Sequence, residues 1–293
     1  MPYGDKLTSC EHFVPQMYLK GFSDTKIYCK GNKHFIWQYD LKTMSQSSQP
    51  VPINSICYEK DLYEIKDSNG EIIAQNYVED KLNLIEKQVD IVFRSIIQKA
   101  ENADSLPDQH FLSDEEKSTL IIFISIQILR DPESLSIMSE ATKMQSTDYS
   151  DLEAKNSVLL NLLPTNIDTE YNCEPLLLRF AEMLYGMAFQ VGITNEDSII
   201  SSDKPYAVEK MCDEAGNRFK TITFPLTSRI VLYLHPLEYV DPQGWNCCFF
   251  MDKDRVRDLT INISYSARRW IFSRNPLTDA QIDLIKAARQ HID

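Results

Sequence analysis

The run S-T-L-I-I-F-I-S-I-Q-I-L-R-D-P at residues 118–132 constrains the fold of this chain more than any other stretch. About ten apolar residues cover every direction of a helix, which is typical of a helix surrounded by protein. A membrane span needs roughly 20 such residues, and this run ends on Arg130, Asp131 and Pro132. The run therefore predicts a buried central helix of a soluble domain, and Pro132 predicts its end because proline cannot continue a helix.

The end of this predicted helix carries two polar side chains, Gln127 and Arg130. They stand three residues apart, so both lie on one face of the last turn. Burying a guanidinium without partners destabilises a fold by roughly several kcal/mol, so Arg130 requires a carboxylate, backbone carbonyls or a route to water. Alternatively, Arg130 caps the last carbonyls of its own helix and gains from the helix dipole. The sequence leaves both readings open.

Charge and cysteine usage bear on partners and compartment. The formal net charge of −13 and the pI near 4.9 disfavour a broad footprint for nucleic acid or an anionic membrane, although a small basic cleft is compatible with them. The 7 cysteines are scattered and form no CxxC pair, which predicts reduced thiols in a cytoplasmic protein. The first residues lack the pattern of a signal peptide. Motifs for phosphate-binding loops, zinc proteases and serine hydrolases are absent from the sequence. Nothing in it indicates an oligomeric state.

Hydrophobic periodicity predicts an α+β fold in which a central helical bundle packs against a small, mainly antiparallel sheet. The expected parts of a single domain, 1–293, are a helical lobe at 76–187, a sheet-containing lobe at 10–75 plus 188–275, and a C-terminal helix at 276–293. A polar connector at 166–173 is the expected lobe boundary. Residues 255–272 are expected to form one further helix. Ser113 and Glu116 fit a capping box at the start of the central helix.

A long helix is expected from residue 76 to about residue 103, with an apolar stripe at steps of three and four residues. Glu79 and Glu86 are seven residues apart and flank that stripe. Either carboxylate could reach Arg130, ligate a metal or act as a general acid or base. Acidic residues on amphipathic helices are far more often solvated, and that reading stays open.

Three further polar residues stand beside predicted elements. His12 precedes a short helix that Pro15 opens, and it is either a capping or packing histidine or a group that exchanges protons near neutral pH. Gln16 lies in the first turn of that helix. Asp203 directly follows a predicted strand, and it is either displayed at a site or is an ordinary turn residue.

Several of these residues recur in segments that resemble a known family. The segments are HFVPQMYLKGF at 12–22, Asp61-Leu-Tyr63, Glu79 with Glu86, QILRDP at 127–132, SDKP at 202–205 and Phe224-Pro225-Leu226. Together they resemble domain of unknown function 4238, an uncharacterised and mostly bacterial family, over about residues 10–275. The family usually has threonine where Asp131 stands and often asparagine where Lys204 stands. The resemblance implies no activity, but it makes the polar residues discussed above motif positions.

Two functional hypotheses follow from this set. The first is a hydrolytic effector, a nuclease or nucleotide-cleaving enzyme in bacterial defence or mobile-element conflict, with or without a divalent metal. Its catalytic residues would be His12, Gln16, Glu79, Glu86 and Asp203, its ligand-binding residues Gln127 and Arg130, and its substrate a nucleic acid or nucleotide. This hypothesis predicts that the side chains of His12, Arg130 and Asp203 converge in an open cleft. The second is a non-catalytic binding or assembly protein whose polar cluster is structural.

Overall fold

The computed structural model describes residues 10–23, 33–102, 108–145, 149–163, 175–212 and 216–290. Its contacts divide the chain into two compact units. The first comprises Met1–Phe13, Cys57–Val89 and Thr119–Tyr185, and the second comprises Val14–Ile56, Asp90–Ser118 and Gly186–Asp293. The lobe bounds expected from the sequence stay a prediction, and the connector expected at 166–173 lies outside the described residues.

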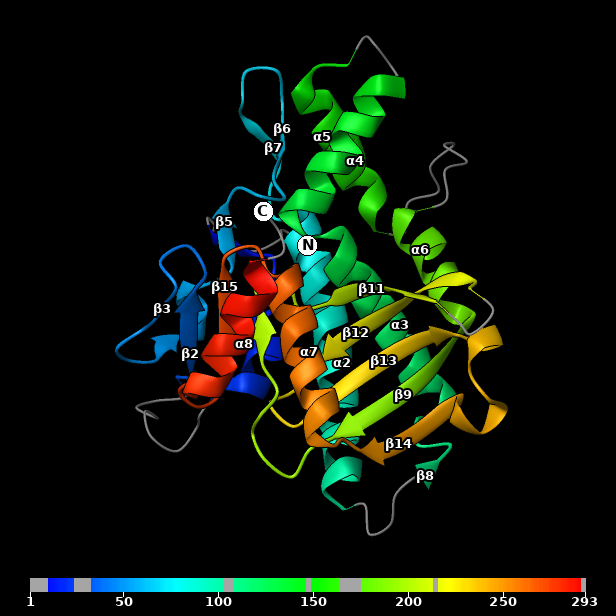
Figure 1. Ribbon diagram of the computed structural model, residues 1–293. Coiled ribbons are helices and arrows are strands. Elements are labelled where there is room, and N and C mark those ends of the chain that lie inside the picture. The colour runs from blue at the N-terminus through cyan, green and yellow to red at the C-terminus, as the bar shows by residue number, and fades with distance from the viewer. Residues whose placement is uncertain are drawn as a thin grey trace. The chain divides into compact units, whose positions relative to one another are not determined.

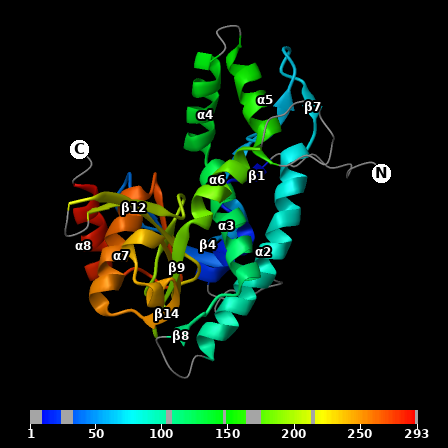
Figure 2. The ribbon, with the colours of Figure 1, turned by 90° about the vertical axis from the view of Figure 1, so that its right-hand side faces the viewer.

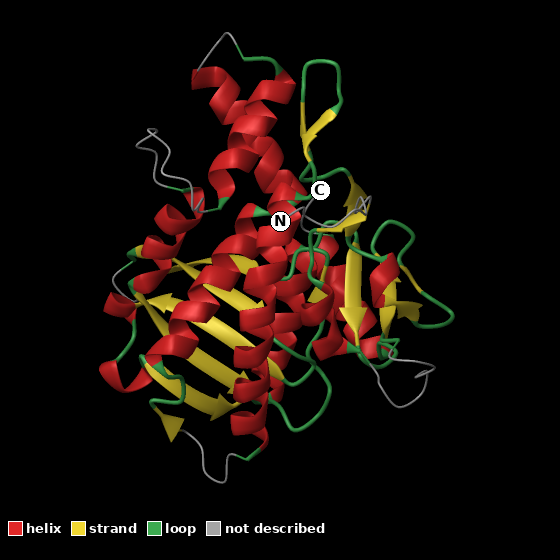
Figure 3. Cartoon of the chain, turned by 180° about the vertical axis from the view of Figure 1, so that it is seen from behind, coloured by secondary structure: helices red, strands yellow, loops and turns green. Residues whose placement is uncertain are grey.

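The fold class α+β is confirmed (Figures 1 and 3). The α-helices of the described residues are α1 Gln16–Leu19, α2 Tyr77–Glu101, α3 Asp114–Leu129, α4 Pro132–Gln145, α5 Asp151–Leu162, α6 Leu176–Tyr185, α7 Lys253–Ser266 and α8 Asp279–Arg289. Helices α2 and α3 each contribute residues to both units. No helix in the described part of the chain is long and apolar enough to cross a membrane.

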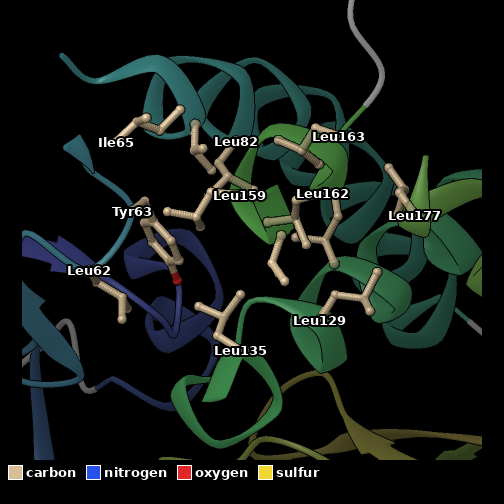
Figure 4. Close-up of a cluster of buried hydrophobic side chains, with 13 residues drawn as sticks. Leu62, Tyr63, Ile65, Leu82, Leu129, Leu135, Leu159, Leu162, Leu163 and Leu177 are labelled. Atoms are coloured by element: carbon tan, nitrogen blue, oxygen red, sulfur yellow. The ribbon is translucent and has the colours of Figure 1, made fainter. Parts of the chain in front are cut away.

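The first unit is mainly helical. Helices α4 and α5 lie side by side (Figure 2), and two small antiparallel sheets pair β1 Cys10–His12 with β5 Tyr58–Lys60 and β6 Ile65–Lys66 with β7 Ile72–Ala74. A cluster of buried side chains from α2 to α6 and from residues 62–65 fills its core. Figure 4 shows Tyr63 among the leucines of this cluster, including Leu82, Leu135 and Leu159.

The second unit holds two larger sheets. One has the order β10-β15-β2-β3, with β4 also paired to β2. The other has the order β11-β12-β13-β9-β14-β8 and is antiparallel except for the pair β14 and β9. The strand bounds are β2 Phe35–Asp40, β3 Ser45–Gln46, β4 Val51–Pro52, β8 Asp108–Gln109, β9 Met187–Ile193, β10 Ser201–Ser202, β11 Ala207–Cys212, β12 Arg218–Pro225, β13 Ile230–Pro236, β14 Asn246–Phe250 and β15 Trp270–Ser273. The expectation of one small sheet is therefore wrong, because the short strands form four separate sheets in the described residues.

The predicted central helix corresponds to α3, Asp114–Leu129, and it begins four residues before the apolar run. The expected capping box explains this start, because the Ser113 Oγ accepts from Glu116 N at 3.1 Å while Glu116 Oε2 accepts from Ser113 N at 2.8 Å. Leu120, Phe123 and Ile124 are at most 1% exposed. Pro132 begins α4, so α3 ends where proline was expected to end it.

The expectation of one helix over 255–272 is wrong in its last third. Helix α7 ends at Ser266, and Trp270–Ser273 form β15. The strand pairs with β2 and β10, so backbone bonds from two neighbours outweigh the helical spacing read from the sequence. The C-terminal helix is shorter than expected, since α8 covers Asp279–Arg289 and begins with a capping box at Thr278 and Gln281.

Candidate functional site

Arg130 follows directly after α3 and is 1% exposed. Its Nη1 donates to Glu86 Oε1 at 2.7 Å, its Nε donates to the Tyr63 hydroxyl at 3.3 Å, and its Nη2 donates to the backbone carbonyl of His12. The Tyr63 hydroxyl in turn donates to the Arg130 carbonyl at 3.1 Å. Of the two readings left open for Arg130, the structure therefore supports pairing with a carboxylate. The side chain is almost completely buried, and the expected convergence of His12, Arg130 and Asp203 in an open cleft stays a prediction.

Two more carboxyl groups belong to the same unit. Glu11, on β1, is fully buried, and its Oε2 accepts from Tyr63 N at 2.7 Å. Glu79 lies in the first turn of α2. Within the described ranges, Glu11 Oε1 and Glu79 Oε2 are buried without a hydrogen-bond partner. Such atoms cost roughly 1–3 kcal/mol each, which is unusual for a purely structural arrangement.

Burial changes the proton affinity of both groups. Loss of hydration raises the pKa of Glu11 to about 7, with Glu64 and Glu79 adding to the effect and the Tyr63 N–H opposing it. The pKa of Glu79 is likewise raised to about 7 by burial, against the opposing charge of Arg130 and with a further increase from Glu86. Both carboxyl groups therefore change protonation near neutral pH, as a general acid or base requires.

Gln127 is 1% exposed and lies one turn before Arg130. Neither its amide nitrogen nor its amide oxygen has a hydrogen-bond partner among the residues that the structure describes. Burying a whole carboxamide without partners costs more than burying a hydroxyl, because two donors and an acceptor are left unsatisfied. The amide is thus available to a ligand or to ordered water.

His12 lies on β1, half-buried, with its ring centroid 5.7 Å from that of Tyr58. Its backbone carbonyl accepts from Arg130 Nη2. The structure thus places His12, Glu79, Glu86, Gln127 and Arg130 in the first unit. We call these five residues, together with Glu11 and Tyr63, the buried cluster.

The two remaining predicted site residues belong to the second unit. Gln16 is the first residue of α1 and is exposed. Asp203 is 3% exposed, and both of its oxygens accept backbone N–H groups, from Arg268 and Arg269 at 2.9 Å and from Trp270 at 3.2 Å. Burial raises the pKa of Asp203, while Arg268 and these N–H groups oppose the rise. Through these hydrogen bonds the Asp203 carboxylate links the end of β10 to the start of β15. A catalytic role for Asp203 stays a prediction.

The sequence left open whether a divalent metal takes part, and the geometry of these side chains does not support one. Across the described ranges, no group of three or more histidine, cysteine, aspartate or glutamate side chains is arranged to hold a metal ion. The side chains that are present include two carboxyl groups of raised pKa, Glu11 and Glu79, and the pKa of Glu79 also responds to the positive charge of Arg130.

Sequence reasoning missed Glu11, because an acidic residue near the start of a chain reads as solvated. It also missed a cavity of about 250 Å³ in the second unit, lined by Glu209, Tyr233, His235 and Asn262. Burial raises the pKa of Glu209, which accepts from the Thr223 hydroxyl at 2.9 Å, and lowers the pKa of His235. Glu209 lies on β11 and His235 on β13, and polar residues at every second position of such strands are the signal that could have predicted a polar sheet face here.

Comparison with known proteins gives one match. A family model described as "Protein of unknown function (DUF4238)" matches residues 11–276. No curated protein and no solved structure matches the chain. The match begins at Glu11 and ends after β15, so it includes every residue of the buried cluster.

Proposed function

We propose that this chain, which belongs to the DUF4238 family of proteins of unknown function, is a hydrolytic enzyme acting on phosphate esters such as nucleotides or nucleic acids. The observation that carries the proposal is Glu79. Its carboxyl group combines a pKa of about 7, a buried oxygen without a partner in the described residues, and the nearby charge of Arg130. Perturbed carboxyl groups of this kind are concentrated at catalytic sites.

The chemistry assigned to the cluster is general acid–base catalysis. Glu79, as a carboxylate, accepts a proton from water while the water oxygen bonds to phosphorus. The bond between phosphorus and the leaving oxygen then breaks, and the proton held on Glu79 passes to that oxygen, so one water is consumed. The charge of Arg130, held by Glu86, favours the negative charge that develops on the phosphoryl oxygens. Glu86, whose side chain is 20% exposed, is the member of this ion pair that contacts solvent.

The test is hydrolysis by the purified full-length chain of p-nitrophenyl phosphate, bis-p-nitrophenyl phosphate, ATP and single-stranded DNA and RNA, with and without Mg²⁺ or Mn²⁺. Glu79→Gln keeps the size and hydrogen-bonding capacity of the side chain but cannot carry the proton. We expect it to lower kcat by about 100-fold or more with little change in KM. Glu140→Gln, at an exposed position of α4 in the same unit, is the matched control and should keep wild-type activity. Absence of hydrolysis across the panel, or an active Glu79→Gln variant, would contradict the proposal.

A second candidate function is favoured by the burial of Arg130. A guanidinium that is 1% exposed and bonded to Glu86, Tyr63 and His12 fits a structural network in a non-catalytic binding or assembly protein. In that case none of the substrates is cleaved, and substitutions in the cluster change stability alone. Roles in bacterial defence and in the cytoplasm stay proposals under either function.

A further inference from the structure

The second unit contains a cavity of about 400 Å³ that the proposed function does not use. Its wall includes Lys20 and Gly21 after α1, Thr227 to Arg229 between β12 and β13, and Arg274 after β15. Lys20 and Gly21 belong to the most specific family segment, 12–22, and Thr227 directly follows the segment Phe224-Pro225-Leu226. One family segment and the residues that directly follow another therefore meet at one cavity, although they are far apart in sequence.

A close backbone approach joins these segments. Ser228 N donates to the Gly21 carbonyl at 3.1 Å. A Cβ atom at Gly21 would lie 2.6 Å from the Leu226 carbonyl oxygen, closer than real Cβ contacts allow. Only glycine fits at this position without displacing backbone. Its presence brings Lys20 to the same cavity as Arg229.

Positive side chains outnumber negative ones by one in the cavity lining, although the chain as a whole carries a formal net charge of −13. Its charged lining consists of Lys20, Arg229 and Arg274 against Glu101 and Asp197. Asp197 is already engaged, because its Oδ1 accepts from Arg274 Nη1 at 3.3 Å and from the Ser228 hydroxyl at 2.6 Å. In an acidic chain, a cavity with an excess of positive side chains has a locally more positive electrostatic potential, which makes it a candidate site for an anion.

Two of the cations are available to a ligand. In the described ranges, neither Lys20 nor Arg229 has a carboxylate within ion-pair distance. Arg229 Nε donates to the Thr194 carbonyl at 3.1 Å, which fixes the guanidinium and leaves its two terminal nitrogens for a ligand. Held in this way, the terminal nitrogens are preorganised for the two-point contact that arginine makes with phosphate.

Thr227 adds a hydroxyl donor to the cavity lining that holds Lys20 and Arg229. It is 8% exposed, and its Oγ1 accepts from the backbone N–H groups of Arg229 and Ile230, both at 3.1 Å. With the oxygen occupied as an acceptor, the hydroxyl hydrogen is free to be donated. Ile97, Ile193 and Ile230 form an apolar part of the same lining. A phosphate ion alone would leave this apolar part unfilled.

We propose that this cavity binds a small organic phosphate monoester. Lys20 and Arg229 take the phosphate oxygens, the Thr227 hydroxyl donates to one of them, and the organic part packs on the isoleucines. Sugar phosphates and nucleoside monophosphates share this chemistry. The site shares no residue with the buried cluster, and its occupancy is measured without turnover, so its success or failure is distinguishable from that of the hydrolytic proposal.

The experiment is isothermal titration calorimetry of the full-length chain with AMP, ribose 5-phosphate, inorganic phosphate and uncharged adenosine. We expect AMP or ribose 5-phosphate to bind more tightly than inorganic phosphate, and adenosine to bind weakest. Tight binding of AMP alone would show that the ligand is a nucleoside monophosphate. Equal binding of AMP and ribose 5-phosphate would show that the sugar phosphate part is sufficient. Lys20→Met and Arg229→Lys should each weaken binding about tenfold, since each removes a charged hydrogen bond worth roughly 1.4 kcal/mol.

Lys210→Met and Arg218→Met are the matched controls, because they remove exposed positive charges of β11 and β12 that do not line the cavity. They should leave affinity unchanged. Lys20 is exposed, so its substitution keeps the fold, and a thermal melt of each variant verifies this. Undetectable binding of both esters at millimolar concentration, or full affinity in Lys20→Met and Arg229→Lys, would overturn the site. Equal affinity for inorganic phosphate and AMP would overturn its assignment to an organic phosphate.

Discussion

Arg130 and Glu86 form an ion pair of 2.7 Å across 44 residues of sequence, with the arginine 1% exposed and the glutamate 20% exposed. The pair is therefore buried at its positive end and open to water at its negative end. This asymmetry matters for energetics, because a desolvated guanidinium depends on every partner it has, while a carboxylate with access to water does not.

Removing the buried charge should be costly. We expect Arg130→Met to lower the free energy of unfolding by about 3 kcal/mol or more, because Glu86, Tyr63 and the His12 carbonyl all lose a charged donor. Arg94→Met is the control, since Arg94 pairs with Asp90 at 2.8 Å while 70% exposed, and exposed pairs contribute roughly 0.2–1 kcal/mol. Urea denaturation of both variants measures the difference. Equal losses in the two variants would show that the guanidinium is not held by its partners.

Removing an unsatisfied amide should have the opposite effect. We expect Gln127→Met to raise the free energy of unfolding by about 1–3 kcal/mol, because a side chain of similar volume replaces polar atoms that have no partner in the described residues. Ser125→Ala removes a buried hydroxyl that likewise has no partner in the described residues, and it should also stabilise. Only Gln127→Met should reduce hydrolysis if the amide serves a ligand. A destabilised Gln127→Met variant would indicate that the amide has a structural partner such as an ordered water.

Stability should depend on pH through Glu11 and Glu79. Their pKa values rise from 4.5 in the unfolded chain to about 7 in the folded chain, so the folded state binds protons more tightly. The resulting stabilisation is complete below about pH 4.5 and is lost as pH rises through about 7. Between about pH 5 and pH 8 the free energy of unfolding should therefore fall, at up to about 1.4 kcal/mol per pH unit for each group.

Glu11→Gln and Glu79→Gln should each make this pH dependence shallower, and Glu140→Gln should leave it unchanged. Urea denaturation at several pH values gives the slopes. Identical slopes in the wild type and in the double variant Glu11→Gln/Glu79→Gln would contradict the raised pKa values.

Asp203 should contribute to stability through the backbone it binds. Asp203→Ala leaves the N–H groups of Arg268, Arg269 and Trp270 without their acceptor, and we expect a loss of about 2–4 kcal/mol. Asp203→Asn keeps one carbonyl oxygen and should lose less. Asp241→Ala, which removes one N-cap bond at an exposed turn, should cost about 1 kcal/mol or less. A thermal melt compares the three, and an unaffected Asp203→Ala would point away from a structural role.

Local sequence signals predicted the elements that depend on neighbouring residues. The apolar run predicted α3, the pair Ser113 and Glu116 predicted its start, and Pro132 predicted its end. They failed at Trp270–Ser273, where pairing with two strands from distant parts of the chain decides the conformation. Sheet organisation likewise depends on pairings that no local pattern records.

The need for a partner at Arg130 was also a property of the sequence, because a guanidinium beside an apolar run cannot be buried alone. Which carboxylate pairs with it was decided only by the tertiary structure. Glu86 reaches the guanidinium, Glu79 stays without that bond and has a raised pKa, and Glu11 joins them from β1. Hydration is lost only when distant segments pack together, so the pKa values near 7 arise from the fold, whereas residue types and helix ends were already determined by the chain.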